Sequence, residues 1–70
     1  REERIARALE VIEANGLITL SDYAYINNLS RTAASLELKE ITADRTSPID
    51  SMGSGSHKVW VKRKERMQFP

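Results

Sequence analysis

The stretch that decides the fold covers residues 18–41 and reads ITLSDYAYINNLSRTAASLELKEI. Thr19, followed by Asp22 three residues later, forms a capping-box pattern, which predicts a short helix near residues 20–27. Asn28 tolerates a positive φ, so the chain can turn sharply after this helix. The first half of the stretch therefore predicts a short helix that ends in a tight turn.

A longer helix is predicted directly after the turn. Ser30 is a favoured N-cap, and the residues from Arg31 to about Ala43 are mostly good helix formers. Apolar residues at i, i+4 and i+7 predict its buried face, namely Ala34, Leu38 and Ile41. At about 100° per residue, the opposite face carries Thr32, Ser35, Leu36, Lys39 and Glu40.

A third helix is predicted before this stretch. Four apolar residues recur there at i, i+3, i+4 and i+7, which marks one face of a helix: Ile5, Ala8, Leu9 and Ile12. This helix should extend from about Glu2 to Asn15, because Gly16 supplies the left-handed conformation that closes such helices.

After the stretch, the pattern changes to that of a β-hairpin. Residues 44–48 form a loop because Pro48 interrupts the helical pattern. Two strands, residues 49–52 and 58–63, then flank the flexible tip GSGS at residues 53–56. Alternation in the second strand predicts that the two valines point inward and that the outer face carries Lys58, Trp60 and Lys62.

One small core follows from these patterns, and it requires no disulfide or metal. With 70 residues, no Cys and a single His, the chain must be held by aliphatic packing. The predicted fold is mainly α, with three helices and a small hairpin over residues 1–63 and a charged tail or linker over residues 64–70. The predicted core consists of Ile5, Leu9, Ile12, Leu29, Ala34, Leu38, Ile41, Val59 and Val61.

The charge is divided unevenly along the chain. Residues 1–45 carry six basic and eight acidic side chains, a net charge of −2, whereas residues 46–70 carry five basic and two acidic ones, a net charge of +3. An anionic partner would therefore dock on the C-terminal third, although a solvated basic tail fits the charge equally well.

The same residues resemble a winged helix-turn-helix domain, as found in bacterial regulators of the DeoR type and at the ends of some larger bacterial proteins. Ala24 occupies the small position of the motif, Asn28 the turn and Ser30 the start of the recognition helix. The segment GSGSHKVWVKR, residues 53–63, resembles the tip and returning strand of the wing. The sequence departs from the family at Leu36, near which family members often carry Arg.

The resemblance implies a module of a bacterial transcriptional regulator that binds double-stranded DNA in the cytoplasm. The third helix would enter the major groove, and the hairpin would lie on the DNA backbone. Short donors and cations suit this role, and the candidate contacts are Ser30, Arg31, Thr32, Ser35, Leu36, Lys39, Lys58, Trp60 and Lys62. The alternative is a protein-interaction or homodimerisation module, favoured by the exposed Leu36 and the near-neutral charge.

Other classes of function find little support in the residues. The single imidazole, His57, has no Cys nearby, so we expect no metal site and no cofactor. No Ser or Thr has a suitable base beside it, which argues against an enzyme. No apolar run reaches the length of a membrane span, and we expect no membrane partner. The chain begins with Arg1 instead of Met, and we expect it to be part of a longer protein.

Overall fold

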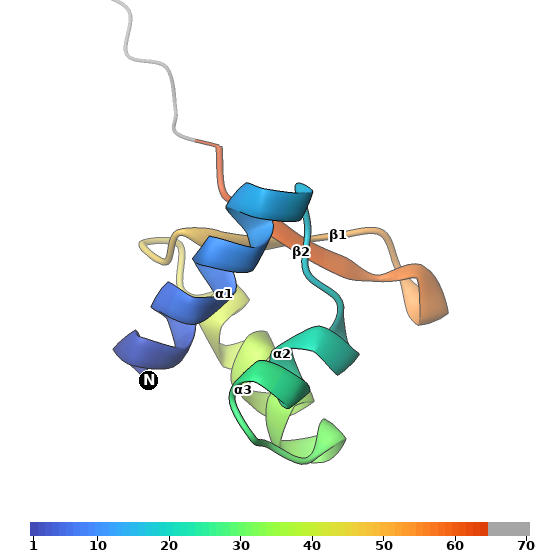
Figure 1. The fold of residues 1–70 in the computed structure, drawn as a ribbon. Coiled ribbons are helices and arrows are strands. Elements are labelled where there is room, and N and C mark those ends of the chain that lie inside the picture. The colour runs from blue at the N-terminus through green and yellow to red at the C-terminus, as the bar shows by residue number, and fades with distance from the viewer. Residues whose placement is uncertain (65–70) are drawn as a thin grey trace, which may run out of the picture.

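A computed structural model describes residues 1–64, and these form three helices followed by a two-stranded antiparallel hairpin (Figure 1). The predicted mainly helical fold with a hairpin wing is therefore confirmed. Of the predicted tail, residues 65–70 lie outside the described residues. Within residues 1–64, no helix is both long and apolar enough to cross a membrane.

Helix α1 spans Glu2–Asn15, as predicted from its apolar periodicity. It ends at Gly16, whose φ of 88° is left-handed and whose amide donates to the carbonyl of Ile12 at 2.6 Å. A glycine adopts this conformation without the steric cost of a Cβ atom, which explains why the helix stops there.

Helix α2 spans Leu20–Ile26 and helix α3 spans Arg31–Ala43. The capping box predicted at the start of α2 is present, because the Thr19 hydroxyl accepts from the Asp22 amide at 3.1 Å and the Asp22 carboxylate accepts in return. Asn28 has a φ of 53°, and the Ser30 hydroxyl caps α3. Local side-chain chemistry thus defines both ends of the turn.

Strand β1 spans Ile49–Met52 and pairs with β2, Val59–Lys62, which is one residue shorter at each end than predicted. The tip contains a single 3₁₀ turn, Gly55–His57. Gly53 has a φ of 84°, and a Cβ atom there would lie 2.8 Å from the carbonyl oxygen of His57. The tip therefore requires glycine at position 53.

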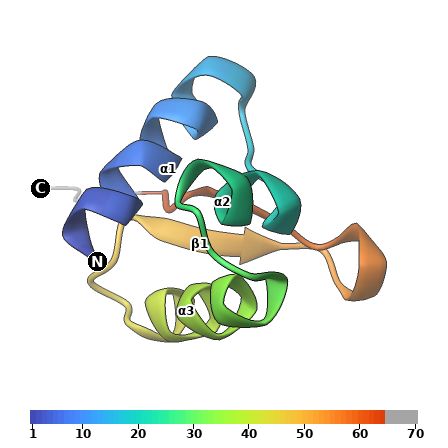
Figure 2. The same cartoon turned by 60° about the horizontal axis from the view of Figure 1, so that its bottom comes forward.

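The hairpin packs against the helices, with β1 against α3 and β2 against α1, and α2 packs directly on α3 (Figure 2). The core consists of Ala8, Ile12, Ile18, Tyr23, Ala24, Ala34, Leu38, Ile41, Ile49 and Trp60. Of the predicted core, the three α3 residues and Ile12 are confirmed, whereas Ile5, Leu9 and Leu29 pack against it partly buried.

The predicted orientation of β2 is wrong. Trp60 is only 7 % exposed and points into the core, while Val59 and Val61 are half-buried on the other face. The cause is a bridge in which Ile18 and Trp60 exchange backbone hydrogen bonds of 2.8 and 2.9 Å. This pairing places both large side chains on the inner face, where the indole buries more apolar area than a valine would.

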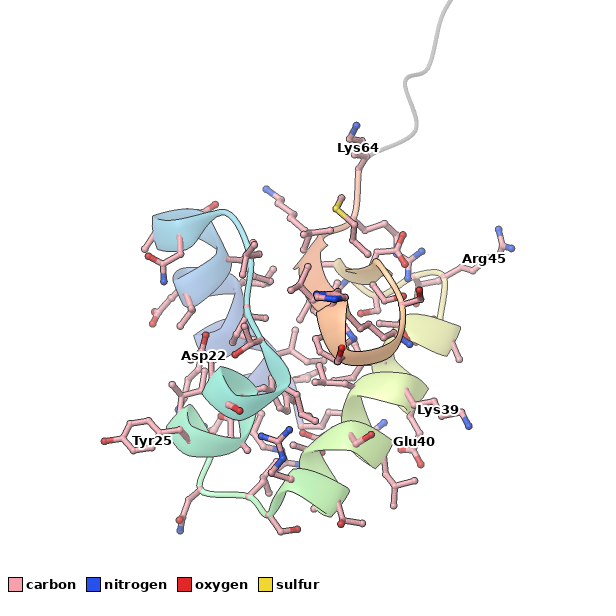
Figure 3. All side chains as sticks on the ribbon, turned by 90° about the vertical axis from the view of Figure 1, so that its right-hand side faces the viewer. Asp22, Tyr25, Lys39, Glu40, Arg45 and Lys64 are labelled. Atoms are coloured by element: carbon pink, nitrogen blue, oxygen red, sulfur yellow. The ribbon has the colours of Figure 1, made fainter. Side chains whose placement is uncertain are left out.

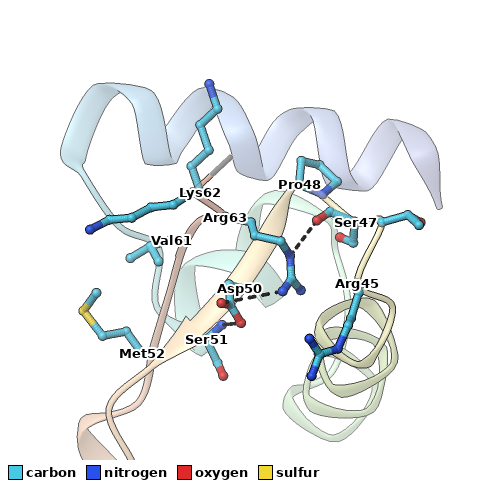
Figure 4. A pocket seen from close by; sticks show the side chains of 11 residues that line it. Arg45, Ser47, Pro48, Asp50, Ser51, Met52, Val61, Lys62 and Arg63 are labelled. Carbon is cyan, nitrogen blue, oxygen red and sulfur yellow. Dashed lines mark hydrogen bonds and ion pairs between the residues drawn. The ribbon is translucent and has the colours of Figure 1, made fainter. Parts of the chain in front are cut away.

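Arg63 fastens the base of the hairpin to the preceding loop. Its guanidinium donates to the carbonyl oxygen of Ser47 at 2.9 Å and lies 3.7 Å from a carboxylate oxygen of Asp50 (Figure 4). It also donates to the carbonyl oxygens of Ile49 at 3.1 Å and Thr42 at 3.2 Å. This cation belongs to the fold and is not available to an external anion.

Candidate nucleic-acid interface

A groove separates α3 from the wing, and it collects several of the predicted contact residues. The cavity has a volume of about 400 Å³ and is lined by Leu20, Arg31, Ser35, Lys39, Gly55, Ser56, Lys58 and Trp60. Three cations and two serine side chains, from α3 and the hairpin, thus line one groove. A concave surface of this kind can hold an anion between several positive charges.

The outer face of α3 is exposed as predicted. Thr32, Ser35, Leu36 and Lys39 are all accessible, and Leu36 is 58 % exposed. Figure 3 shows Lys39 pointing away from the body of the molecule. Ser30 differs from these residues because its hydroxyl accepts from the Ala33 amide at 3.0 Å as the helix cap.

Arg31, which lines the groove, connects α3 with α2. Its guanidinium donates to the Ser21 hydroxyl of α2 at 2.5 Å. Within residues 1–64 it has no carboxylate within ion-pair distance. Arg31 is therefore oriented by a neutral partner and keeps its full charge for a ligand.

On the wing, Lys58 and Trp60 lie together, whereas Lys62 lies elsewhere. The Lys58 ammonium is 5.9 Å from the centre of the Trp60 ring, a cation–π arrangement. The indole Nε1 is buried and has no hydrogen-bond partner in the described part of the chain. Lys62 lines a separate hollow beside the end of α1. The structure thus brings Lys58 and Trp60 to the α3 groove but not Lys62.

The two acidic residues of α3 pair with arginines at the start of the chain. Glu37 is buried, and its two carboxylate oxygens each accept from the Arg4 guanidinium at 2.7 Å. Tyr23 donates its hydroxyl to the same carboxylate at 2.6 Å. The hydrogen bonds from Arg4 and then from Tyr23 lower the pKa of Glu37, while burial and the adjacent carboxylate raise the pKa of Tyr23. The exposed Glu40 pairs with Arg1.

Ion pairing divides the basic residues into two sets. Arg1, Arg4, Arg7 and Arg63 have acidic partners. The cations without such a partner in residues 1–64 are Arg31, Lys39, Arg45, Lys58, Lys62 and Lys64. All of the second set lie on α3, the loop after it, or the hairpin and the residues that follow. Of these six cations, Arg31, Lys39 and Lys58 line the groove between α3 and the hairpin, whereas Lys62 and Lys64 line the separate hollow beside α1.

Arg45 is a candidate contact that the sequence analysis did not select. It lies in the loop directly after α3, and Figure 3 shows it extending toward the same side as Lys39. The available signal was an arginine in the predicted loop between the third helix and the hairpin.

No metal-binding cluster of three or more His, Cys, Asp or Glu residues occurs among residues 1–64. His57 lies exposed in the 3₁₀ turn of the wing tip.

Among known proteins, the chain matches no family model, no curated protein and no solved structure.

Proposed function

We propose that this chain is a double-stranded DNA-binding module of a bacterial transcriptional regulator acting in the cytoplasm. In this proposal, α3 enters the major groove, and the tip of the hairpin lies against the adjacent backbone. The observation that carries the proposal is the α3 groove, whose lining includes Arg31, Lys39 and Lys58, three cations without acidic partners in the described residues.

The neutralised carboxylates support the same proposal. An acidic side chain beside the recognition surface would repel phosphates. Glu37 is turned inward and paired with Arg4, and Glu40 is paired with Arg1. The potential at the outer face of α3 is therefore more positive than its sequence alone indicates.

Sequence preference would come from the short side chains of α3. Thr32 and Ser35 can donate to base edges, and Leu36 can contact the methyl group of thymine. The cations would supply affinity that does not depend on sequence, because each phosphate contact releases condensed counterions.

A salt titration tests the proposal directly. Affinity for a labelled duplex of mixed sequence is measured by fluorescence anisotropy between about 50 and about 200 mM salt. Lys39→Ala and Lys58→Ala are each expected to weaken binding to all duplexes and to reduce the slope of log affinity against log salt by about one unit. Absence of salt-dependent binding in the unmodified chain would refute the proposal.

The matched comparisons are Lys62→Ala and Lys64→Ala, because each substitution removes one lysine charge outside the groove. Lys64→Ala should leave the slope unchanged. Lys62→Ala, in contrast, tests whether the base of the hairpin also contacts the DNA backbone, as predicted from the sequence. Such a contact would reduce the slope for this variant as well. Equal losses for all four variants would indicate a diffuse charge effect and would remove the groove as the binding site.

The second candidate is a protein-interaction module that uses α3, and the exposed Leu36 favours it. Leu36→Asp separates the two functions. If this variant binds DNA like the parent chain but no longer binds a partner protein, α3 is the surface that contacts the partner protein.

A further inference from the structure

The outer face of the hairpin carries apolar side chains that the core does not use. Because Trp60 points inward, Val59 and Val61 lie on the opposite face together with Met52, which pairs with Val59 in the strand register. Met52 is 57 % exposed. Figure 4 shows Met52 and Val61 extending to the same side of the hairpin. This face therefore presents one exposed apolar side chain, Met52, beside two half-buried valines, and accessible apolar area of this kind is available to an interaction partner.

This face opens into a hollow beside the C-terminal end of α1. The hollow has a volume of about 480 Å³, and its apolar floor includes Ile12, Met52 and Val61. Gly16 also lines it, and a Cβ atom at that position would meet nothing within 4 Å. The end of α1 therefore leaves room for a side chain from another molecule.

The two rims of the hollow carry opposite charges. Glu13 lies on the α1 side, and Lys62 and Lys64 lie on the hairpin side. None of the three forms an ion pair with any residue from 1 to 64. An acidic rim and a basic rim thus face each other across an apolar floor without contact.

Such a surface is complementary in charge to its own copy. A two-fold axis through the hollow would set the apolar floor against its own copy and would place Glu13 opposite the lysines of the second chain. An isologous interface requires this kind of self-complementary patch. We infer that the hollow between α1 and the hairpin binds a second copy of this chain and forms a two-fold dimer.

The inferred dimer does not depend on the proposed function. The hollow shares no residue with the α3 groove, so both surfaces can be occupied at once. If the chain binds DNA, a two-fold dimer would present two recognition helices to half-sites about 34 Å apart or a multiple of that distance.

The first test compares two exposed apolar residues of nearly equal accessibility. Sedimentation equilibrium of the chain is followed from about 10 μM to about 1 mM, because an interface of this small size is expected to be weak and transient. The mass should rise toward that of two chains. Met52→Asp should abolish the rise, while Leu36→Asp, at 58 % exposure on α3, should preserve it. A monomeric parent chain at the highest concentration, or the reverse pattern of the two variants, overturns the inference.

The second test exchanges the charges of the rims and does not disturb the apolar floor. Glu13→Lys should weaken dimerisation by about tenfold or more, because it sets like charges opposite one another. Adding Lys62→Glu and Lys64→Glu to that variant should restore the dimer. Glu2→Lys makes the same charge change at the other end of α1 and should have no effect. If the triple variant remains as dissociated as Glu13→Lys, the rims do not face each other and the two-fold arrangement is wrong.

Discussion

The inner and outer faces of α3 use charged residues in opposite ways. On the inner face, Glu37 is buried and bound by Arg4 and Tyr23, so its charge is matched within the fold. On the outer face, Lys39 has no acidic partner among the described residues. A charge that is paired inside the fold and a charge that is left unpaired at the surface therefore contribute to different properties of the protein. Glu37 should determine stability, and Lys39 should determine binding.

The largest effect on stability is expected from a substitution at the apolar centre of the inner face of α3. Leu38 is fully buried, and Leu38→Ala leaves a cavity that should lower the free energy of unfolding by about 2–5 kcal/mol. A domain of this size has only a few kcal/mol of stability, so most of the variant should be unfolded. Urea denaturation followed by circular dichroism measures the loss. A midpoint equal to that of the parent chain would mean that the buried face of α3 is assigned incorrectly.

The next effect concerns the buried carboxylate and its response to pH. Glu37→Gln removes the charge that Arg4 and Tyr23 satisfy, and should lower the free energy of unfolding by about 1–3 kcal/mol at pH 7. Because the folded-state pKa of Glu37 lies below its unfolded value of about 4.3, its contribution is complete above that pH and is lost as pH falls through the folded-state pKa.

Unfolding curves of the parent chain and of Glu37→Gln between about pH 7 and about pH 3 therefore test this pair. The variant should lose less stability on acidification than the parent chain. Glu40→Gln is the control, since Glu40 is exposed on the same helix and should change stability little. Parallel pH profiles for the parent chain and Glu37→Gln would show that the buried carboxylate does not stabilise the fold.

The smallest effect on stability belongs to the outer face. Ser35→Ala and Leu36→Ala should change the free energy of unfolding by less than about 0.5 kcal/mol, because both side chains are exposed. If α3 reads DNA, each should alter discrimination among duplexes by about 1–3 kcal/mol per affected base pair and leave non-specific binding nearly unchanged. Competition titrations with single-base-pair variants of a selected site measure this. A uniform loss over all duplexes would place these side chains on the backbone instead.

The helices were predictable because their signals are local. Gly16 ends α1 because its backbone adopts the left-handed conformation directly after the helix. Ser30 begins α3 because its side chain caps the first turn of the helix. The exposed face of α3 follows from its apolar periodicity. The predicted bounds of both helices are confirmed for this reason.

The orientation of β2 could not be predicted from its own sequence. Valine and tryptophan are both apolar, so residues 59–61 fit either face of a strand. The choice is made by Ile18, more than forty residues earlier, through its bridge to Trp60. Arg4 and Glu37 are also far apart in the sequence, and no local pattern predicts that they form an ion pair. As a result, the composition of the groove and the neutralisation of α3 emerge only from the tertiary structure.

We expect the Ile18–Trp60 bridge to divide the hairpin into two parts that open separately. Both amides of the bridge are hydrogen-bonded within the core, and we expect them to exchange with solvent deuterium only when the whole domain unfolds. The tip beyond Met52 and Val59 has exposed backbone and no buried side chain, so it should open independently at a much smaller free-energy cost. The wing can thus adjust its tip to a bound surface while its base, at Trp60, keeps a constant position relative to α3.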